Sequence, residues 1–178
     1  MTKAEQFYDG QNKLAAYDQE TRYMLGEAAE LDVLYEEKVD LPTIVYMLRN
    51  TFKERATRYK VLGKEDLEIY DNEYVYDSEG NKRKKDPASG FCMVSSYLIY
   101  SMTGGDKVWE LHGTPLHWWL YHKQTQQRFD ITRTQFDTKT LNSHYFMGKN
   151  VKYLNVDPMF YDILKAKSHK LAKCAGLE

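Results

Sequence analysis

The chain has 178 residues, of which 42% are hydrophobic and 14% aromatic, enough for one domain with a packed core. Its formal net charge is −1, so no overall field attracts it to nucleic acid or to an anionic membrane. Because no export signal and no apolar run of membrane-spanning length is found, we expect a cytoplasmic protein without membrane association. In that reducing compartment the only two cysteines, Cys92 and Cys174, are expected to be free, with one disulfide between them as the alternative.

Helical patterns fill the first third of the chain. Thr2 followed by Glu5 is a capping-box pattern, and apolar residues then recur at helical spacing to about residue 37. Gly10 and Gly26 interrupt this pattern, so it forms either one helix or two. We interpret it as amphipathic and packed on the core, with a partner-binding arm as the alternative.

A second helix is predicted between Asp40 and Gly63. Asp40 is a suitable cap, Pro42 is tolerated in the first turn, and Gly63 is a natural stop. The apolar face between them is continuous and consists of Leu41, Ile44, Val45, Leu48, Phe52, Ala56 and Tyr59.

The next segment carries a basic run. Residues 73–76 read as a short strand, 77–80 as a turn, and 81–85 as the basic run. This run is short, has acidic neighbours and lacks interleaved aromatic residues. We therefore interpret it as a solvated hairpin or loop, and nucleic acid is not an expected partner.

A third helix is predicted from its expected cap, Ser89, to the pair Gly104-Gly105. Strand-like runs follow at 107–111, 117–122, 128–132 and 151–156. Asp157-Pro158 then marks the start of a last helix. Helices followed by short, closely connected strands predict an α+β fold with an antiparallel sheet.

Cys92 would be the third residue of this third helix. A thiolate at that position faces the positive end of the helix dipole and unpaired backbone N–H groups, which stabilise it. The Cys92 N–H would be one donor of an oxyanion hole. The small residues before it, Ala88, Ser89 and Gly90, would let a substrate approach the sulfur closely. A buried structural cysteine is the alternative.

A predicted hairpin brings a histidine to an aspartate. If residues 123–126 form the turn, Trp119 opposes Asp130 and His117 opposes Thr132, so that His117 and Asp130 are diagonal neighbours on one face. A slip of one residue would separate them. A carboxylate in an apolar strand needs a partner, and orienting an imidazole would provide one. A core histidine and a strand-edge aspartate are the alternatives.

Other site chemistries are not indicated. His112, His117 and His122 are spaced five residues apart, so on a strand His117 points away from the other two. No glycine-rich phosphate loop and no G-x-S-x-G elbow occurs. We expect no metal and no cofactor.

The central segments resemble a known family. Asp86-Pro-Ala-Ser-Gly-Phe-Cys92, Thr103-Gly-Gly-Asp106, His117-Trp-Trp119 and Phe129-Asp-Ile-Thr-Arg-Thr-Gln-Phe136 follow the order of motifs in the YunG-like proteins of bacteria and their phages. These proteins are similar to compact papain-like and NlpC/P60-like cysteine hydrolases. The resemblance covers residues 86–136. It departs at Phe91, where the family typically has a polar residue, usually Gln.

The resemblance implies an assignment of roles. A helix carrying Cys92 would pack on a small antiparallel sheet carrying His117 and Asp130, as in a papain-like core. Cys92 would be the nucleophile, His117 the general base and Asp130 its orienting partner. Trp118, Trp119 and Gly90 are the expected substrate-binding residues.

The expected function is that of a cysteine-dependent hydrolase or acyl-transfer enzyme on an amide or isopeptide of a protein or peptide substrate. Peptidase, amidase, deamidase and transglutaminase-like activities share this machinery. The alternative, which Phe91 favours, is a non-catalytic binding or inhibitor protein on the same fold with a degenerate site.

One domain is expected over residues 1–178. Within it, residues 1–39 would form a helical N-terminal extension and residues 40–178 the papain-like core. The extension would cover the cleft, bind a partner or enlarge the core. No feature of the sequence predicts the oligomeric state.

Overall fold

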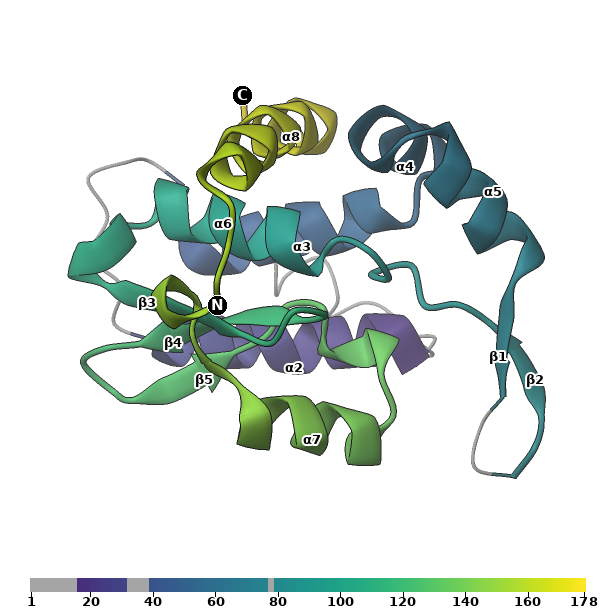
Figure 1. The fold of residues 1–178 in the computed structure, drawn as a ribbon, viewed down its shortest axis with the longest axis horizontal. Helices are drawn as coiled ribbons and strands as arrows, with labels where there is room; N and C mark the ends of the chain where they lie inside the picture. Colours follow the sequence, from purple (N-terminus) through teal and green to yellow (C-terminus); the bar gives the residue numbers. More distant parts are fainter. Residues whose placement is uncertain (1–15, 32–38, 77–78) are drawn as a thin grey trace.

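The structure is a computed structural model that describes residues 16–31, 39–76 and 79–178 (Figure 1). It has an α+β fold, as predicted. Its helices are α2 (Ala16–Glu30), α3 (Leu41–Phe52), α4 (Arg55–Leu62), α5 (Lys64–Asn72), α6 (Cys92–Met102), α7 (Thr138–Met147) and α8 (Pro158–Ala175). Its strands are β1 (Tyr74–Tyr76), β2 (Lys82–Lys84), β3 (Trp109–Gly113), β4 (Trp118–His122), β5 (Gln127–Phe129) and β6 (Lys149–Asn150).

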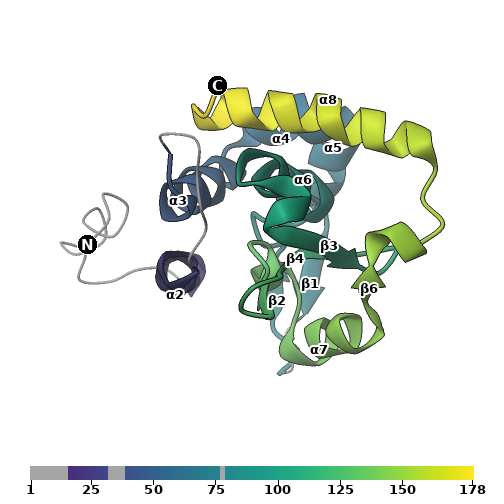
Figure 2. The ribbon, with the colours of Figure 1, turned by 90° about the vertical axis from the view of Figure 1, so that its left-hand side faces the viewer.

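The strands form two antiparallel units. A four-stranded sheet has the order β5-β4-β3-β6, and β1 pairs with β2 in a separate hairpin. Helix α6 lies between α8 and the sheet, and α7 lies on the other side of the sheet (Figures 1 and 2). The core fills the space around α6, where Trp118 of β4 meets Phe160 and Tyr161 of α8 at ring-centroid distances of 5.9 and 6.4 Å.

The β4–β5 hairpin has the predicted register. Leu120 pairs with Phe129 and His122 with Gln127, so residues 123–126 form the turn. The strand itself is shorter than predicted, because β5 ends at Phe129. Asp130 therefore lies immediately after the strand rather than on it.

The predicted helix from Asp40 to Gly63 is two helices. The Asp40 side chain caps α3 by accepting a hydrogen bond from the Thr43 N–H (2.9 Å), and Gly63 ends α4 with φ +98°. Glu54 is extended and separates the two helices. The apolar pattern did not reveal the break because side chains on both sides of it, such as Phe52 and Val61, are buried.

The N-terminal prediction is confirmed over α2. Gly26 lies inside this helix and does not interrupt it, since α2 is continuous from Ala16 to Glu30. The predicted cap at Thr2 and the break at Gly10 lie outside the described residues.

Two helices were not predicted, and one predicted strand is wrong. Neither α5 nor α7 has a buried residue, and α7 has only a weak amphipathic pattern. The segment 151–156 begins with a 3-10 turn over Val151–Tyr153 instead of a strand. The basic run forms strand β2 of an exposed hairpin, in agreement with the prediction, and Lys85 pairs with Glu73 at 2.8 Å.

None of the helices in the described ranges combines the length and apolar character needed to cross a bilayer. Both cysteines are free thiols, as expected.

Candidate active site

Cys92 is the first residue of α6, not the third. The predicted cap Ser89 lies in a turn instead, in which the Ser89 N–H binds the Asp86 carbonyl (2.9 Å) and the Phe91 N–H binds the Ala88 carbonyl (3.1 Å). Gly90 has φ +85°, a left-handed conformation that continues this turn and delays the helix. The thiol thus stands at the positive end of α6, as expected, but is only 6% exposed.

The Phe91 side chain packs in the core. Its ring stacks on Phe52 at 4.6 Å and lies 5.0 Å from the Arg58 guanidinium, and its side chain is fully buried. The residue before the cysteine therefore packs the helix start and has no polar part in the site.

A buried arginine holds the turn that precedes Cys92. One terminal nitrogen of Arg58 donates to the carbonyls of Pro87 (2.9 Å) and Ser89 (2.7 Å), and the other pairs with Asp66 at 2.7 Å. Because these two carbonyls and the Asp66 carboxylate accept from the guanidinium, the buried charge of Arg58 is compensated. The same bonds attach the turn to α4.

His117 and Asp130 form a buried pair. His117 Nε2 donates to Asp130 Oδ2 at 2.6 Å, and both side chains are essentially inaccessible. This leaves Nδ1 as the imidazole nitrogen available to the Cys92 thiol, which interacts with the ring closely enough to affect its pKa. The hydrogen bond of the thiol itself goes to the Leu116 carbonyl oxygen, 3.9 Å from the sulfur. Burial opposes the charged imidazole, but the hydrogen bond to Asp130, the interaction with Cys92 and the Asp130 charge outweigh it and raise the pKa of His117 to about 9.

Asp130 receives further donors from two directions. Its Oδ1 accepts from the N–H (3.1 Å) and hydroxyl (3.3 Å) of Thr132. Its Oδ2 accepts from the Tyr145 hydroxyl of α7 at 2.7 Å. Burial, and then the Asp130 charge, raise the pKa of Tyr145, so it stays a donor at neutral pH. Tyr145 was not predicted, because α7 itself gave only a weak pattern.

Gln135 also contacts the imidazole. Its Nε2 lies 3.2 Å from His117 Nδ1 and 3.1 Å from Thr132 Oγ1. Gln135 belongs to the motif that carries the family resemblance, but the sequence assigned it no role.

A second buried arginine holds the segment around Asp130. Arg49 donates to the Ile131 carbonyl (3.1 Å) and to Thr134 Oγ1 (2.9 Å). Thr134 in turn donates to Asp86 at 2.9 Å, at the start of the turn before Cys92. The segments that carry the cysteine and the aspartate are therefore tied to each other.

Of the three expected substrate-binding residues, the two tryptophans are buried and the glycine lines a pocket. Trp118 is 1% exposed and packs in the core, so it presents no surface to a ligand. Trp119 is also buried and packs on His117 (5.5 Å) and Tyr145 (5.0 Å). Its edge reaches a hollow of about 370 Å³ beside Tyr145. Only Gly90 lies in the wall of the pocket that adjoins the imidazole.

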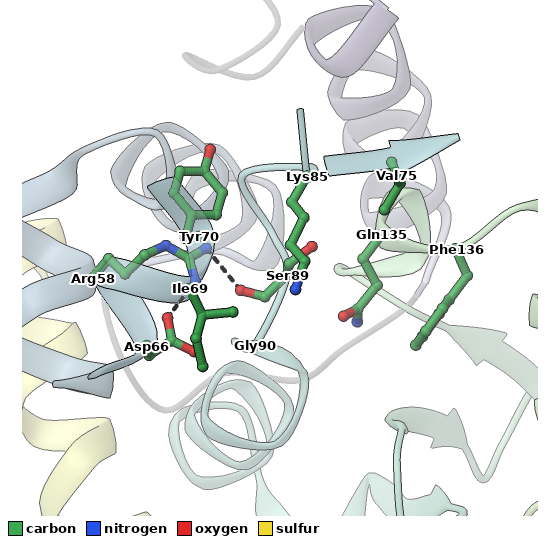
Figure 3. Close-up of a pocket in the computed structure, with 10 residues that line it drawn as sticks. All are labelled: Arg58, Asp66, Ile69, Tyr70, Val75, Lys85, Ser89, Gly90, Gln135 and Phe136. Carbon is green, nitrogen blue, oxygen red and sulfur yellow. Dashed lines mark hydrogen bonds and ion pairs between the residues drawn. The ribbon is translucent and has the colours of Figure 1, made fainter. Parts of the chain in front are cut away.

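That pocket has a volume of about 360 Å³ (Figure 3). Ser89 and Gly90 form part of its wall, and Gln135 and Phe136 lie across from them. Its other lining residues are Arg58, Asp66, Ile69, Tyr70, Val75 and Lys85. Because Gln135 and the Phe136 ring (4.8 Å) both contact His117, the pocket adjoins the imidazole.

No metal site accompanies this arrangement in the described part of the chain, where no three His, Cys, Asp or Glu side chains converge on a possible ion. No family model matches the chain, and no curated protein or solved structure is significantly similar to it.

Proposed function

We propose that the chain is a cysteine-dependent hydrolase or acyl-transfer enzyme that acts on an amide or isopeptide bond of a protein or peptide. The observation that carries the proposal is the buried hydrogen bond between His117 and Asp130, with the Cys92 thiol close enough to the imidazole to affect its pKa. A thiol at a helix start, an imidazole that faces it, and a carboxylate behind the imidazole are the groups that thiol catalysis needs.

The reactive state is a thiolate paired with an imidazolium. Because the pKa of His117 is raised to about 9, the imidazole holds a proton at neutral pH. The sulfur attacks the carbonyl carbon of the substrate, a carbon–sulfur bond forms, and the carbonyl electron pair moves onto oxygen. In this state His117 holds the proton that it later gives to the leaving amine.

The remaining steps use the same proton. When the tetrahedral intermediate collapses, the carbon–nitrogen bond breaks and the amine takes the proton from His117 Nδ1. A water molecule then gives a proton to Nδ1 and attacks the thioester, and the carboxylic acid leaves while sulfur departs as the thiolate. If an amine replaces water in this step, the product is a new amide, so hydrolysis and acyl transfer share the site.

Asp130 keeps the imidazole in the required tautomer. Its bond to Nε2 leaves Nδ1 for the sulfur, and its charge stabilises the imidazolium. The donors from Thr132 and Tyr145 fix the carboxylate itself.

The pocket beside the imidazole is suited to part of a peptide. Its volume of about 360 Å³ lies in the range of ligand pockets, and its walls mix apolar Ile69 and Val75 with polar groups such as Gln135. A helix that carries cysteine and packs on an antiparallel sheet next to histidine is also the arrangement expected of a papain-like core, which supports the proposed relation to the YunG-like proteins.

A second candidate is a non-catalytic binding protein with the same fold. The small exposure of Cys92, 6%, favours it, as does the position of the Leu116 carbonyl, 3.9 Å from the sulfur. In such a protein the thiol would be a packed core group.

Two reagents distinguish the candidates. Iodoacetamide and 4-nitrophenyl acetate are added to the intact protein, and the modified peptide is located by mass spectrometry, with Cys174 as an internal reference thiol. An enzyme of the proposed kind acylates Cys92 faster than Cys174 and loses this advantage in His117→Ala. Equal or slower reaction at Cys92, unaffected by His117→Ala, would sink the enzyme proposal.

A further inference from the structure

We infer that Gln135 is a catalytic residue whose side-chain N–H, together with the backbone N–H of Cys92, binds the oxyanion formed in the reaction. This inference rests on the proposed function. Gln135 ends a 3-10 turn, Arg133–Gln135, that follows Asp130 in the chain. The inference gives Gln135 the role that the residue before the nucleophile would have in the family pattern. In this chain that residue is Phe91, which is buried in the core.

The first donor is the N–H of Cys92 itself. The α6 hydrogen bonds begin with the Ser95 N–H, which donates to the Phe91 carbonyl at 2.9 Å. Within the described part of the chain, the Cys92 N–H has no acceptor. It is adjacent to the sulfur, at the positive end of the helix, where negative charge is stabilised.

A second donor has to come from across the site. Phe91, the residue before the cysteine, has no polar atom in its side chain and is buried in the core. Gln135 supplies an amide that reaches the same imidazole nitrogen that is available to the thiol, with Nε2 at 3.2 Å from His117 Nδ1. Gln135 is also part of the pocket wall opposite Gly90 (Figure 3).

The amide is held in place by a separate bond. An amide nitrogen carries two hydrogens, and one of them is directed at Thr132 Oγ1 at 3.1 Å. Thr132 is itself fixed through its own donor bonds to Asp130 Oδ1. Gln135 is thus anchored by the same carboxylate that orients His117, and its second hydrogen is left for the site.

The protonation state of His117 decides what the second hydrogen does. A neutral imidazole with its proton on Nε2 accepts the Gln135 N–H at Nδ1. In the imidazolium form Nδ1 carries a proton and no longer accepts, so the Gln135 N–H is free to donate to another acceptor. The thiolate–imidazolium pair that attacks the substrate therefore leaves this second donor available to the oxyanion.

Oxyanion binding by Gln135 and mere orientation of His117 by Gln135 predict different effects on two reactions of Cys92. Alkylation by iodoacetamide needs the thiolate but forms no oxyanion, whereas acylation by 4-nitrophenyl acetate passes through one. If Gln135 only orients His117, its removal slows both reactions by the same factor. If it binds the oxyanion, its removal slows acylation alone.

The experiment measures both rates at Cys92 in the full chain of the wild type, Gln135→Ala and Gln135→Met. We expect the acylation rate to fall by about a hundredfold in both variants, with the alkylation rate within about twofold of wild type. Gln135→Met keeps the length of the side chain but has no donor, so it separates loss of the N–H from loss of packing. Gln127→Ala, which alters an exposed glutamine on β5, is the matched control and should change neither rate.

Equal losses in the two reactions, or no loss of acylation, would overturn the inference. Thermal unfolding of each variant identifies any that does not fold, and in that case Gln135→Met is assessed in place of Gln135→Ala. If wild-type Cys92 is not acylated faster than Cys174, the proposed function itself fails. Rapid wild-type acylation without a Gln135 effect overturns only the oxyanion role.

Discussion

Tyr145 and His117 share one oxygen atom of Asp130. The phenol hydroxyl lies 2.7 Å and the imidazole Nε2 2.6 Å from Oδ2. Helix α7 is therefore linked to the imidazole through a single carboxylate oxygen, although it contributes no residue to the family resemblance.

Removal of the Tyr145 hydroxyl tests this link. Tyr145→Phe deletes one donor to a buried carboxylate, so we expect the free energy of unfolding to fall by about 2 kcal/mol in urea denaturation. The acylation rate should fall less than in Asp130→Ala, because Thr132 still holds the carboxylate. Tyr153→Phe alters an exposed tyrosine and should leave both quantities unchanged. An unchanged stability in Tyr145→Phe would contradict the assigned hydrogen bond.

The raised pKa of His117 depends on Asp130. We expect the NMR titration of the His117 ring to give a pKa of about 9 in the wild type. In Asp130→Asn the imidazole stays buried but loses its charged partner, so its pKa should fall toward 6.5, the ordinary histidine value. The alkylation rate of Cys92 at pH 6 should decrease in the same variant. A His117 pKa that stays near 9 in Asp130→Asn would show that Asp130 is not the main cause of the raised value.

The same shift makes stability depend on pH. Because the pKa of His117 is higher in the folded state than the ordinary 6.5, its proton stabilises the fold fully below pH 6.5, and this contribution disappears as pH rises through about 9. The shift corresponds to a contribution on the order of 3 kcal/mol for this buried group. The difference in unfolding free energy between wild type and His117→Gln should shrink by this amount from pH 6 to pH 9.5. A constant or growing difference would contradict the direction of the pKa shift.

Gly90 and Gly80 allow a matched test of the turn before Cys92. Both have positive φ, +85° and +82°, but a Cβ on Gly80 would meet nothing within 4 Å, whereas one on Gly90 would lie 3.1 Å from Leu62 Cδ1. Gly80→Ala should cost about 1 kcal/mol from backbone strain alone. Gly90→Ala should cost more and should also slow acylation of Cys92, because Leu62 and Asp66 have to give way beside the turn. Equal costs and an unchanged acylation rate would contradict the close fit at Gly90.

Features set by short-range chemistry were predictable from the sequence. The cap at Asp40 and the start of α8 at Asp157-Pro158 each depend on residues within one helical turn. The β4–β5 register follows from a four-residue turn and from alternation of side chains, and it places His117 and Asp130 together as expected.

Features set by long-range packing were not predictable from the sequence. Serine is a common N-cap residue, but Arg58 binds the Ser89 carbonyl and the helix begins later, at Cys92. Tyr145 reaches Asp130 from α7, a helix without a buried residue and with only a weak amphipathic pattern. Gln135 was visible in the motif, but its proximity to Nδ1 required the fold.

The two buried arginines have a consequence for how the site is assembled during folding. The bond from Arg58 to Ser89 spans 31 residues, whereas the bond from Arg49 to Ile131 spans 82. The longer loop costs more entropy to close, and its far end is synthesised later. A fragment of residues 86–136 would contain Cys92, His117 and Asp130 but neither arginine. We therefore expect Arg58 to order the turn before Cys92 earlier than Arg49 orders the segment around Asp130, which orients His117. The pair of Cys92 and His117 would then form only once the chain has been synthesised past residue 131.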